Sequence, residues 1–234
     1  MKIGIIGAMS EEINLLLDRM ENRTSTHAAR LDFSEGTIGG TPVVLVACNM
    51  GKVAAAVCAE ILLERFGVTH LVFTGVAGSL DPSVDIGDLV ISTDCVQHDM
   101  DATGLGHEIG QNPDFGITYF PADERLRAAA ISAAAVACPE VGVREGRVAT
   151  GDQFVNDPKL KDHIVETFGA MCCEMEGAAV GQVAWLNEVP FVVVRAISDK
   201  ADDEGGVDFR TFLEDSARRC AALVERMVLD LGEE

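Results

Sequence analysis

Short apolar runs alternate with helical patterns along almost the whole chain, and this alternation limits the fold more than any other feature. Residues 2–7 form an apolar run before a helical segment, and residues 69–74 form another run directly after the helical pattern of residues 52–66. Strands that alternate with helices in this way are typical of α/β proteins whose sheet is covered on both faces. The sequence therefore predicts a three-layer α/β fold with a central mixed, mostly parallel twisted sheet flanked by helices.

Periodicity and turn residues predict the individual elements. Helices are expected over residues 10–23, 52–66, 123–138, 158–168, 177–187 and 208–231, and strands over residues 2–7, 33–38, 42–47, 69–74, 88–92, 142–149, 171–174 and 191–197. Gly39 and Gly40 predict a hairpin, and the glycines of residues 75–78 predict a turn. Residues 98–120 lack periodicity, so we expect a long loop, which in a compact domain is usually functional. No linker or repeat divides the sequence, so one domain over residues 1–234 is expected.

Charge and cysteine usage narrow the class of protein. The chain has 18 Lys and Arg against 38 Asp and Glu, for a formal net charge of −20. Such a surface disfavours nucleic acid and anionic membranes as partners, although it also suits a protein that is simply very soluble. No apolar stretch approaches the roughly 18 residues of a membrane helix. The seven cysteines are scattered without a CxxC spacing. We therefore expect a protein of the reducing cytoplasm without a zinc site.

Three motifs fail on inspection. The start of the chain has Gly4 and Gly7 but not the GxGxxG spacing of a dinucleotide fold. Gly51 and Lys52 resemble the end of a phosphate-binding P-loop, but residue 46 is Val where that motif requires Gly. The run 98–101 (His-Asp-Met-Asp) resembles half of a metal site and lacks a second cluster. We expect the residues of the run 98–101 to make polar contacts within a loop.

Carboxylates gather where the predicted strands end. Glu12 follows the first strand, Glu174 and Glu176 lie at the end of another, and Asp199 comes two residues after the apolar run 191–197. Taken singly, each is explained as a helix cap or a surface charge. In open α/β sheets, however, ligands bind beyond the carboxyl ends of the strands. The four carboxylates together therefore indicate a site at that edge of the sheet.

Paired carboxylates suit the cleavage of a glycosidic bond, because one acid protonates the leaving group while the other activates water. A departing adenine has the same requirement, since it must take up a proton, most plausibly at N7. Apolar side chains near the carboxylates are able to stack on a base or hold a thioether, or they only pack the core: Met9, Met50, Phe154, Met175 and Phe209.

Six motifs carry a resemblance to a known family. They are IGIIGAMSEE at residues 3–12, GKVAAA at 51–56, TGVAG at 74–78, GDQF at 151–154, EMEGAA at 174–179 and VVVRAISD at 192–199. In this order, over residues 1 to about 230, the chain resembles the bacterial 5′-methylthioadenosine/S-adenosylhomocysteine nucleosidases of the nucleoside phosphorylase superfamily.

The resemblance implies a division of roles. Asp199 would be the general acid at adenine N7, with Ser198 orienting its carboxyl. Glu12 would activate the attacking water, with Arg195 and Glu174 placed around it. An acid that delivers this proton needs a raised pKa, which burial supplies.

The same resemblance implies how substrate is held. Further substrate-binding positions would be Met9, Met50, Val76, Gly78, Phe154, Val155, Met175, Glu176 and Phe209. Among these, Glu176 would hold the ribose hydroxyls and Phe154 would stack on the adenine. Neither a metal nor an organic cofactor is implied, and the substrate would be a small adenine nucleoside. The family works as homodimers, in which the 98–120 loop closes the neighbour's 5′ pocket through positions that are here Ala102, Leu105, His107 and Pro113.

Departures from the family leave the 5′ specificity open. Many relatives have Ser where this chain has Val76, and the positions of Leu105 and His107 are often aromatic. The nearest rival is a futalosine or aminodeoxyfutalosine hydrolase, whose substrate carries a benzoate that His107 would meet. A phosphorylase or an AMP nucleosidase would need cations for phosphate near the motifs, and Glu12 would repel that anion. A nucleoside-binding module without activity would be expected to lack Glu12 or Asp199.

Overall fold

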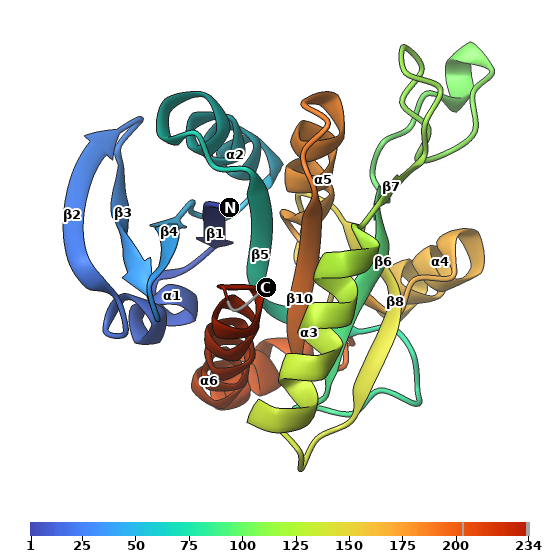
Figure 1. The fold of residues 1–234 in the computed structure, drawn as a ribbon. Helices are drawn as coiled ribbons and strands as arrows, with labels where there is room; N and C mark the ends of the chain where they lie inside the picture. Colours follow the sequence, from blue (N-terminus) through green and yellow to red (C-terminus); the bar gives the residue numbers. More distant parts are fainter. Residues whose placement is uncertain (203, 233–234) are drawn as a thin grey trace.

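The computed structural model describes residues 1–202 and 204–232 and arranges them around a ten-stranded sheet (Figure 1). The strands are β1 (Ile3–Gly7), β2 (Glu21–Ala28), β3 (Leu31–Ile38), β4 (Thr41–Ala47), β5 (His70–Ser79), β6 (Leu89–Gln97), β7 (Tyr119–Pro121), β8 (Val143–Thr150), β9 (Cys172–Glu174) and β10 (Phe191–Asp199). The helices are α1 (Ser10–Leu17), α2 (Lys52–Phe66), α3 (Glu124–Ala137), α4 (Pro158–Phe168), α5 (Gly177–Leu186) and α6 (Gly205–Gly232), with a short 3₁₀ helix at Thr103–Leu105.

The sheet is mixed, and part of it closes on itself. The strand order is β10-β6-β8-β9-β5-β1-β4-β3-β2, and β5 also pairs with β10, so five strands form a closed ring from which the others extend. Strand β1 lies parallel to both of its neighbours, β4 and β5. Parallel pairing also joins β5 to β10, β6 to β8 and β8 to β9, whereas β2, β3 and β7 pair in antiparallel fashion.

Helices cover both faces of the sheet, as the sequence predicts. One apolar core lies between the sheet and helices α2 and α5, and it includes Ala59 and Ala184. The second core lies under α1, α3 and α6 and includes Ala130 and Leu223. Helices α3 and α6 are seen in front of the sheet in Figure 1. The small side chains of α2, α3 and α5 let these helices lie close to the strands. The predicted three-layer α/β fold is confirmed.

The predicted helix over residues 10–23 is wrong in its second half. Helix α1 ends at Leu17, and residues 21–28 form the edge strand β2 against β3. This strand, ENRTSTHA, is exposed at almost every position. Because neither of its faces is buried, it shows no apolar alternation from which a strand could be predicted.

Other predicted bounds also differ from the structure. Residues 75–78 are not a turn, because β5 continues through them and pairs with β10 from Gly75 to Gly78. Strand β6 continues five residues beyond Ser92, to Gln97. The segment 98–120 is mostly loop, as expected, but it also contains the 3₁₀ helix and the start of β7. Its outer part projects from the body of the molecule (Figure 1).

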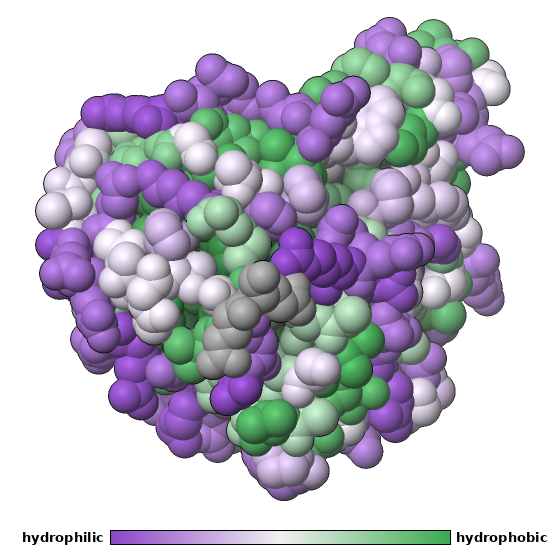
Figure 2. Space-filling view, viewed as in Figure 1, coloured by the Kyte–Doolittle hydropathy of each residue, from purple (hydrophilic) through white to green (hydrophobic). Residues whose placement is uncertain are grey.

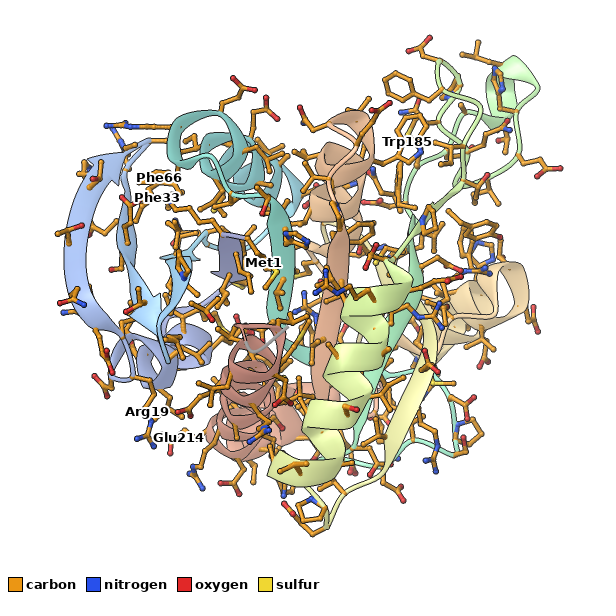
Figure 3. The ribbon with its side chains drawn as sticks, viewed as in Figure 1. Met1, Arg19, Phe33, Phe66, Trp185 and Glu214 are labelled. Carbon is orange, nitrogen blue, oxygen red and sulfur yellow. The ribbon has the colours of Figure 1, made fainter. Side chains whose placement is uncertain are left out.

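Aromatic contacts anchor the projecting segment to the body. Phe115 lies against Trp185 of α5 with ring centroids 5.7 Å apart, and Trp185 is seen beside this segment in Figure 3. Hydrophilic side chains cover much of the face seen in Figure 2, in keeping with the net charge of −20. No helix among the described residues is long and apolar enough to cross a membrane.

Candidate active site

One cavity opens at the carboxyl ends of β1, β5, β9 and β10. Residues that were singled out from the sequence supply most of its lining: Met9, Glu12, Met50, Val76, Gly78, Phe154, Val155, Glu174, Met175, Glu176, Ser198, Asp199 and Phe209. They come from positions up to 200 residues apart, counting from Met9 to Phe209. The parallel strands β1, β5 and β10 end together at this edge of the sheet, and β9 reaches it by antiparallel pairing with Gly78 and Ser79 of β5.

Glu12 is buried at the floor of the cavity and is held by backbone donors. Its Oε2 accepts from the backbone N–H groups of Ala8 (2.6 Å) and Met9 (2.9 Å), and its Oε1 accepts from Val76 (3.1 Å). Burial raises the pKa of Glu12, while the Arg195 guanidinium and these N–H groups oppose that rise. Glu12 Oε1 lies so close to the backbone of β5 that a Cβ on Gly75 would collide with it, which explains the glycine at this position.

Arg195 does not line the cavity but lies beneath it, 1% exposed. Its Nη2 donates to Glu174 Oε2, and its guanidinium carbon lies 4.1 Å from the centre of the Phe73 ring. Burial alone would lower the pKa of Arg195, but the carboxylates of Glu174 and Glu12 raise it further above its usual range. An unpaired charge at that depth would be very costly, and the ion pair with Glu174 removes most of this cost, while the charge of Arg195 also acts on the nearby Glu12.

The carboxyl groups of Glu174 and Glu176 lie close enough for the charge of one to affect the pKa of the other. Glu174 also accepts from the Thr150 hydroxyl and from the N–H of Gly177 (2.7 Å to Oε2). Burial and the neighbouring Glu174 raise the pKa of Glu176. Its Oε1 accepts from the N–H of Gly51 at 2.7 Å, which ties it to the start of α2. Glu176 therefore favours the protonated form, which can both donate and accept hydrogen bonds.

Asp199 ends β10 and is 2% exposed. Its Oδ2 accepts from the Ser198 hydroxyl at 2.9 Å and its Oδ1 from the N–H of Ala201 at 2.9 Å. Burial raises the pKa of Asp199, and the carboxylates of Asp208 and Asp202 add to the rise. Gly78 stands close by, and a Cβ there would lie 2.7 Å from Asp199 Oδ1. The site thus places a carboxyl whose pKa is raised in the wall of the cavity.

Apolar side chains form the remaining walls. Phe154 and Phe209 meet edge to face with ring centroids 5.8 Å apart, and Phe154 is 44% exposed. Met50 is 66% exposed at the opening. A planar base or a thioether would remove this apolar surface from water, which is favourable.

The four residues of the projecting segment do not line this cavity. Leu105 is 80% exposed, and the cavity lining includes none of Ala102, Leu105, His107 and Pro113. His107 lies 3.2 Å from Gln111 through Nδ1, within its own segment. Among the described residues there is also no cluster of three or more His, Cys, Asp or Glu side chains suited to a metal ion.

Sequence reasoning missed part of the lining and one buried residue. Ala8, Ala77, Gln153 and Cys173 also line the cavity. Thr150, fully buried, joins Glu174 to the N–H of Ala178 through its hydroxyl. Thr150 ends a strand directly before the GDQF motif, and this position in the sequence could have identified it as a residue of the site.

Comparison with known proteins places the chain in the phosphorylase superfamily. Residues 2–229 match the model of the phosphorylase superfamily. The 5′-methylthioadenosine/S-adenosylhomocysteine nucleosidase of Anoxybacillus flavithermus is 44% identical over 100% of both chains.

Solved structures give the same family. The nucleosidase of this kind from Neisseria meningitidis, in complex with methylthio-immucillin-A, has a TM-score of 0.95 and 35% identity over 98% of this chain and 99% of that one. A futalosine hydrolase of Helicobacter pylori has a TM-score of 0.93 and 35% identity over 98% and 97% of the two chains. With its cavity of buried carboxylates, the chain belongs to the 5′-methylthioadenosine/S-adenosylhomocysteine nucleosidases, N-glycosidic hydrolases of the phosphorylase superfamily.

Proposed function

We propose that this enzyme hydrolyses 5′-methylthioadenosine and S-adenosylhomocysteine, and also 5′-deoxyadenosine, to adenine and the corresponding ribose. The observation that carries the proposal is the pairing in one cavity of Asp199, whose pKa is raised, with Glu12, which three backbone N–H groups hold in place. Such a pair supplies the acid and the water-activating base that N-glycosidic hydrolysis requires.

Asp199 is proposed to protonate adenine N7. The N-glycosidic bond breaks as the electron pair leaves with the base, so a proton on N7 neutralises the charge that develops there. Ser198 and the N–H of Ala201 fix the carboxyl, each at 2.9 Å, and burial raises its pKa, which favours an acid able to deliver a proton. Phe154 would stack on the base, with the backbone of Val155 at its edge.

Glu12 is proposed to take a proton from the attacking water. Its carboxylate has lone pairs left beyond its three N–H partners, and a water held there would face the sugar. Arg195 and Glu174 would keep Glu12 oriented, Glu176 and the Met175 backbone would hold the ribose, and Met9, Met50, Val76, Gly78 and Phe209 would line the sugar and the 5′ substituent. Phosphate is disfavoured as the attacking group, because the described residues that line the cavity include no lysine or arginine.

The pH dependence of activity follows from the two pKa shifts. Glu12 must be ionised, so kcat/KM is expected to fall as pH drops through its raised pKa. Asp199 must be protonated, so kcat/KM is expected to fall again as pH rises through its raised pKa. The profile for methylthioadenosine should therefore be bell-shaped. The Asp199→Asn variant is the control, since its residual activity should lack the alkaline limb; an unchanged limb would contradict the assignment.

We further propose a homodimer in which each projecting segment closes the neighbour's cavity through Ala102, Leu105, His107 and Pro113. Exposed apolar side chains on α2 and α5 support this, among them Val53 (75%), Val57 (44%) and Leu186 (47%). A second copy would cover them and remove apolar surface from water. The seven buried, unpaired cysteines support the reducing cytoplasm as the place of action.

The dimer is tested by placing a charge on this surface. Val53→Asp is expected to shift the protein from dimer to monomer in sedimentation velocity and to raise KM, because the cavity loses its neighbouring segment. Val136→Asp on α3 is the matched control, since Val136 is 63% exposed on the opposite layer. A wild-type protein that is monomeric and fully active would contradict the proposal.

A futalosine-type substrate is the second candidate, because a futalosine hydrolase shares this fold at 35% identity. Initial rates of adenine release from methylthioadenosine, S-adenosylhomocysteine, 5′-deoxyadenosine and aminodeoxyfutalosine separate the two. Higher kcat/KM for the two thio-nucleosides supports the proposed function. Release from aminodeoxyfutalosine alone would replace it.

A further inference from the structure

A carboxylate outside the cavity joins three segments of the chain that frame it. Asp99 Oδ1 accepts from Lys52 Nζ at 2.7 Å, and Asp99 Oδ2 accepts from the backbone N–H of Asp152 at 2.9 Å. Asp152 Oδ1 in turn accepts from the backbone N–H of Lys52 at 2.8 Å. These contacts form a closed triangle between the residues after β6, the start of α2 and the segment after β8. We call these three residues the clasp.

Each arm of the clasp lies next to residues that line the cavity. Lys52 follows Met50 and Gly51, and the Gly51 N–H donates to Glu176 Oε1 at 2.7 Å. Asp152 precedes the lining residues 153–155. Helix α2 has no side-chain cap of its own at Gly51, so Asp152 satisfies the first free N–H of that helix from another segment. The clasp therefore fixes the 153–155 segment relative to Glu176.

His98 strengthens the grip on the same segment. Its backbone N–H donates to the carbonyl of Thr150 at 2.9 Å, and its buried ring lies so close to Gly151 that a Cβ there would collide with it. Two residues beyond Thr150, the backbone N–H of Asp152 donates to Asp99 Oδ2. The side chains of Lys52 and Asp99 are 19% and 24% exposed, so their ion pair is partly screened from water. Burial alone would raise the pKa of Asp99, but Lys52 and the Asp152 N–H lower it.

We propose that Asp99 is a positioning residue for the nucleoside, which acts through Lys52 and Asp152 to hold the base-stacking wall of the cavity at a fixed distance from Glu176. Asp99 contacts no residue placed in the acid–base chemistry: Glu12, Arg195 and Asp199 are not among its partners. Its loss should therefore weaken the binding of substrate more than it slows the chemical step. The inference rests on the proposed nucleosidase function.

The test is a split between KM and kcat in clasp variants. For Asp99→Asn we expect KM to rise about tenfold, the size typical of one charge-assisted hydrogen bond, with kcat changed less than about threefold. Lys52→Gln should do the same. The double variant should lose less than the sum of the two single losses, because both single variants remove the Lys52–Asp99 pair, although Lys52→Gln also removes the bond from Nζ to Gln97 Oε1 at 3.2 Å. Lys52→Arg keeps the charge and should remain near wild type. Asp32→Asn is the control for the loss of one negative charge, because Asp32 is an exposed acid on β3 that pairs with His27 of β2.

Two results would overturn the inference. One is an Asp99→Asn or Lys52→Gln enzyme with a lower melting temperature and unchanged KM, which shows a purely structural role. The other is additive losses in the double variant. If Asp99→Asn does not fold, the Lys52 variants carry the same test. The kinetics use whichever nucleoside of the panel the wild type cleaves best, so a failure of the proposed substrates is seen in the wild type and a failure of the clasp only in the variants.

Discussion

Asp199→Asn is expected to lower kcat for methylthioadenosine by about 10²–10⁴-fold, the usual contribution of a positioned general acid. The amide keeps the shape of the carboxyl. Its oxygen can still accept from the Ala201 N–H and its NH2 group can donate to Ser198 Oγ, the two partners that lie 2.9 Å from the carboxyl oxygens of Asp199. It has no acidic proton to deliver to the base. The fold should be retained, as judged by the thermal melting curve, and steady-state adenine release measures the loss.

A change of leaving group provides the control for this variant. In a 5′-methylthioriboside of p-nitrophenol, the leaving group is p-nitrophenolate, which needs no protonation. Asp199→Asn should therefore cleave this substrate with a much smaller loss of rate than it shows for the release of adenine. Equal losses on both substrates would mean that Asp199 serves binding or folding and not proton delivery.

Glu12→Gln is the second large effect, with an expected loss in kcat of about 10²–10⁴-fold while nucleoside binding persists. Glutamine keeps an acceptor oxygen for part of the N–H cage formed by Ala8, Met9 and Val76, but it cannot take a proton from water. Equilibrium binding of an uncleaved analogue by calorimetry should show a dissociation constant close to that of the wild type.

The adjacent Glu11 provides a matched control for Glu12→Gln. Glu11 is exposed on the same turn of α1 and contacts only the hydroxyl of Ser10 among the hydrogen bonds of the described residues. Glu11→Gln should leave kcat and KM at wild-type values. Rapid cleavage by Glu12→Gln, or an equal loss in both variants, would remove Glu12 from the mechanism.

The alternation of apolar strands and helices was enough to predict the layers of this fold, because both periodicities are properties of local sequence. Helix α2 was predicted with its observed bounds, since Gly67 ends it in a left-handed conformation with φ +62°. Strand β2 was missed because it is an exposed edge strand whose partners come from the chain that follows it. The glycines of residues 75–78 suggested a turn, whereas Gly75 and Gly78 make room in a strand for Glu12 and Asp199.

The position of the site was predictable for a similar reason. Glu12 and Asp199 lie at the carboxyl ends of the parallel strands β1 and β10, which meet at one edge of the sheet. Glu174 and Glu176 reach the same site from β9, which is antiparallel to β5, so the expectation from parallel strand ends does not explain their position. What the sequence could not reveal is contact between residues far apart in the chain. Thr150 beside Glu174, the Asp99–Lys52–Asp152 triangle, and the placement of Arg195 beneath the cavity all depend on tertiary packing. The run at residues 98–101 resembles half of a metal site, but polar loop contacts were the expectation, and in the structure Asp99 makes such contacts with Lys52 and Asp152.

The most direct test of the central claim is the release of adenine from methylthioadenosine by the wild-type enzyme, with and without inorganic phosphate. We predict the same rate in both conditions, with free methylthioribose as the sugar product. A rate that depends on phosphate, with the sugar recovered as its 1-phosphate, would contradict the account by showing that phosphate and not a water at Glu12 attacks the sugar.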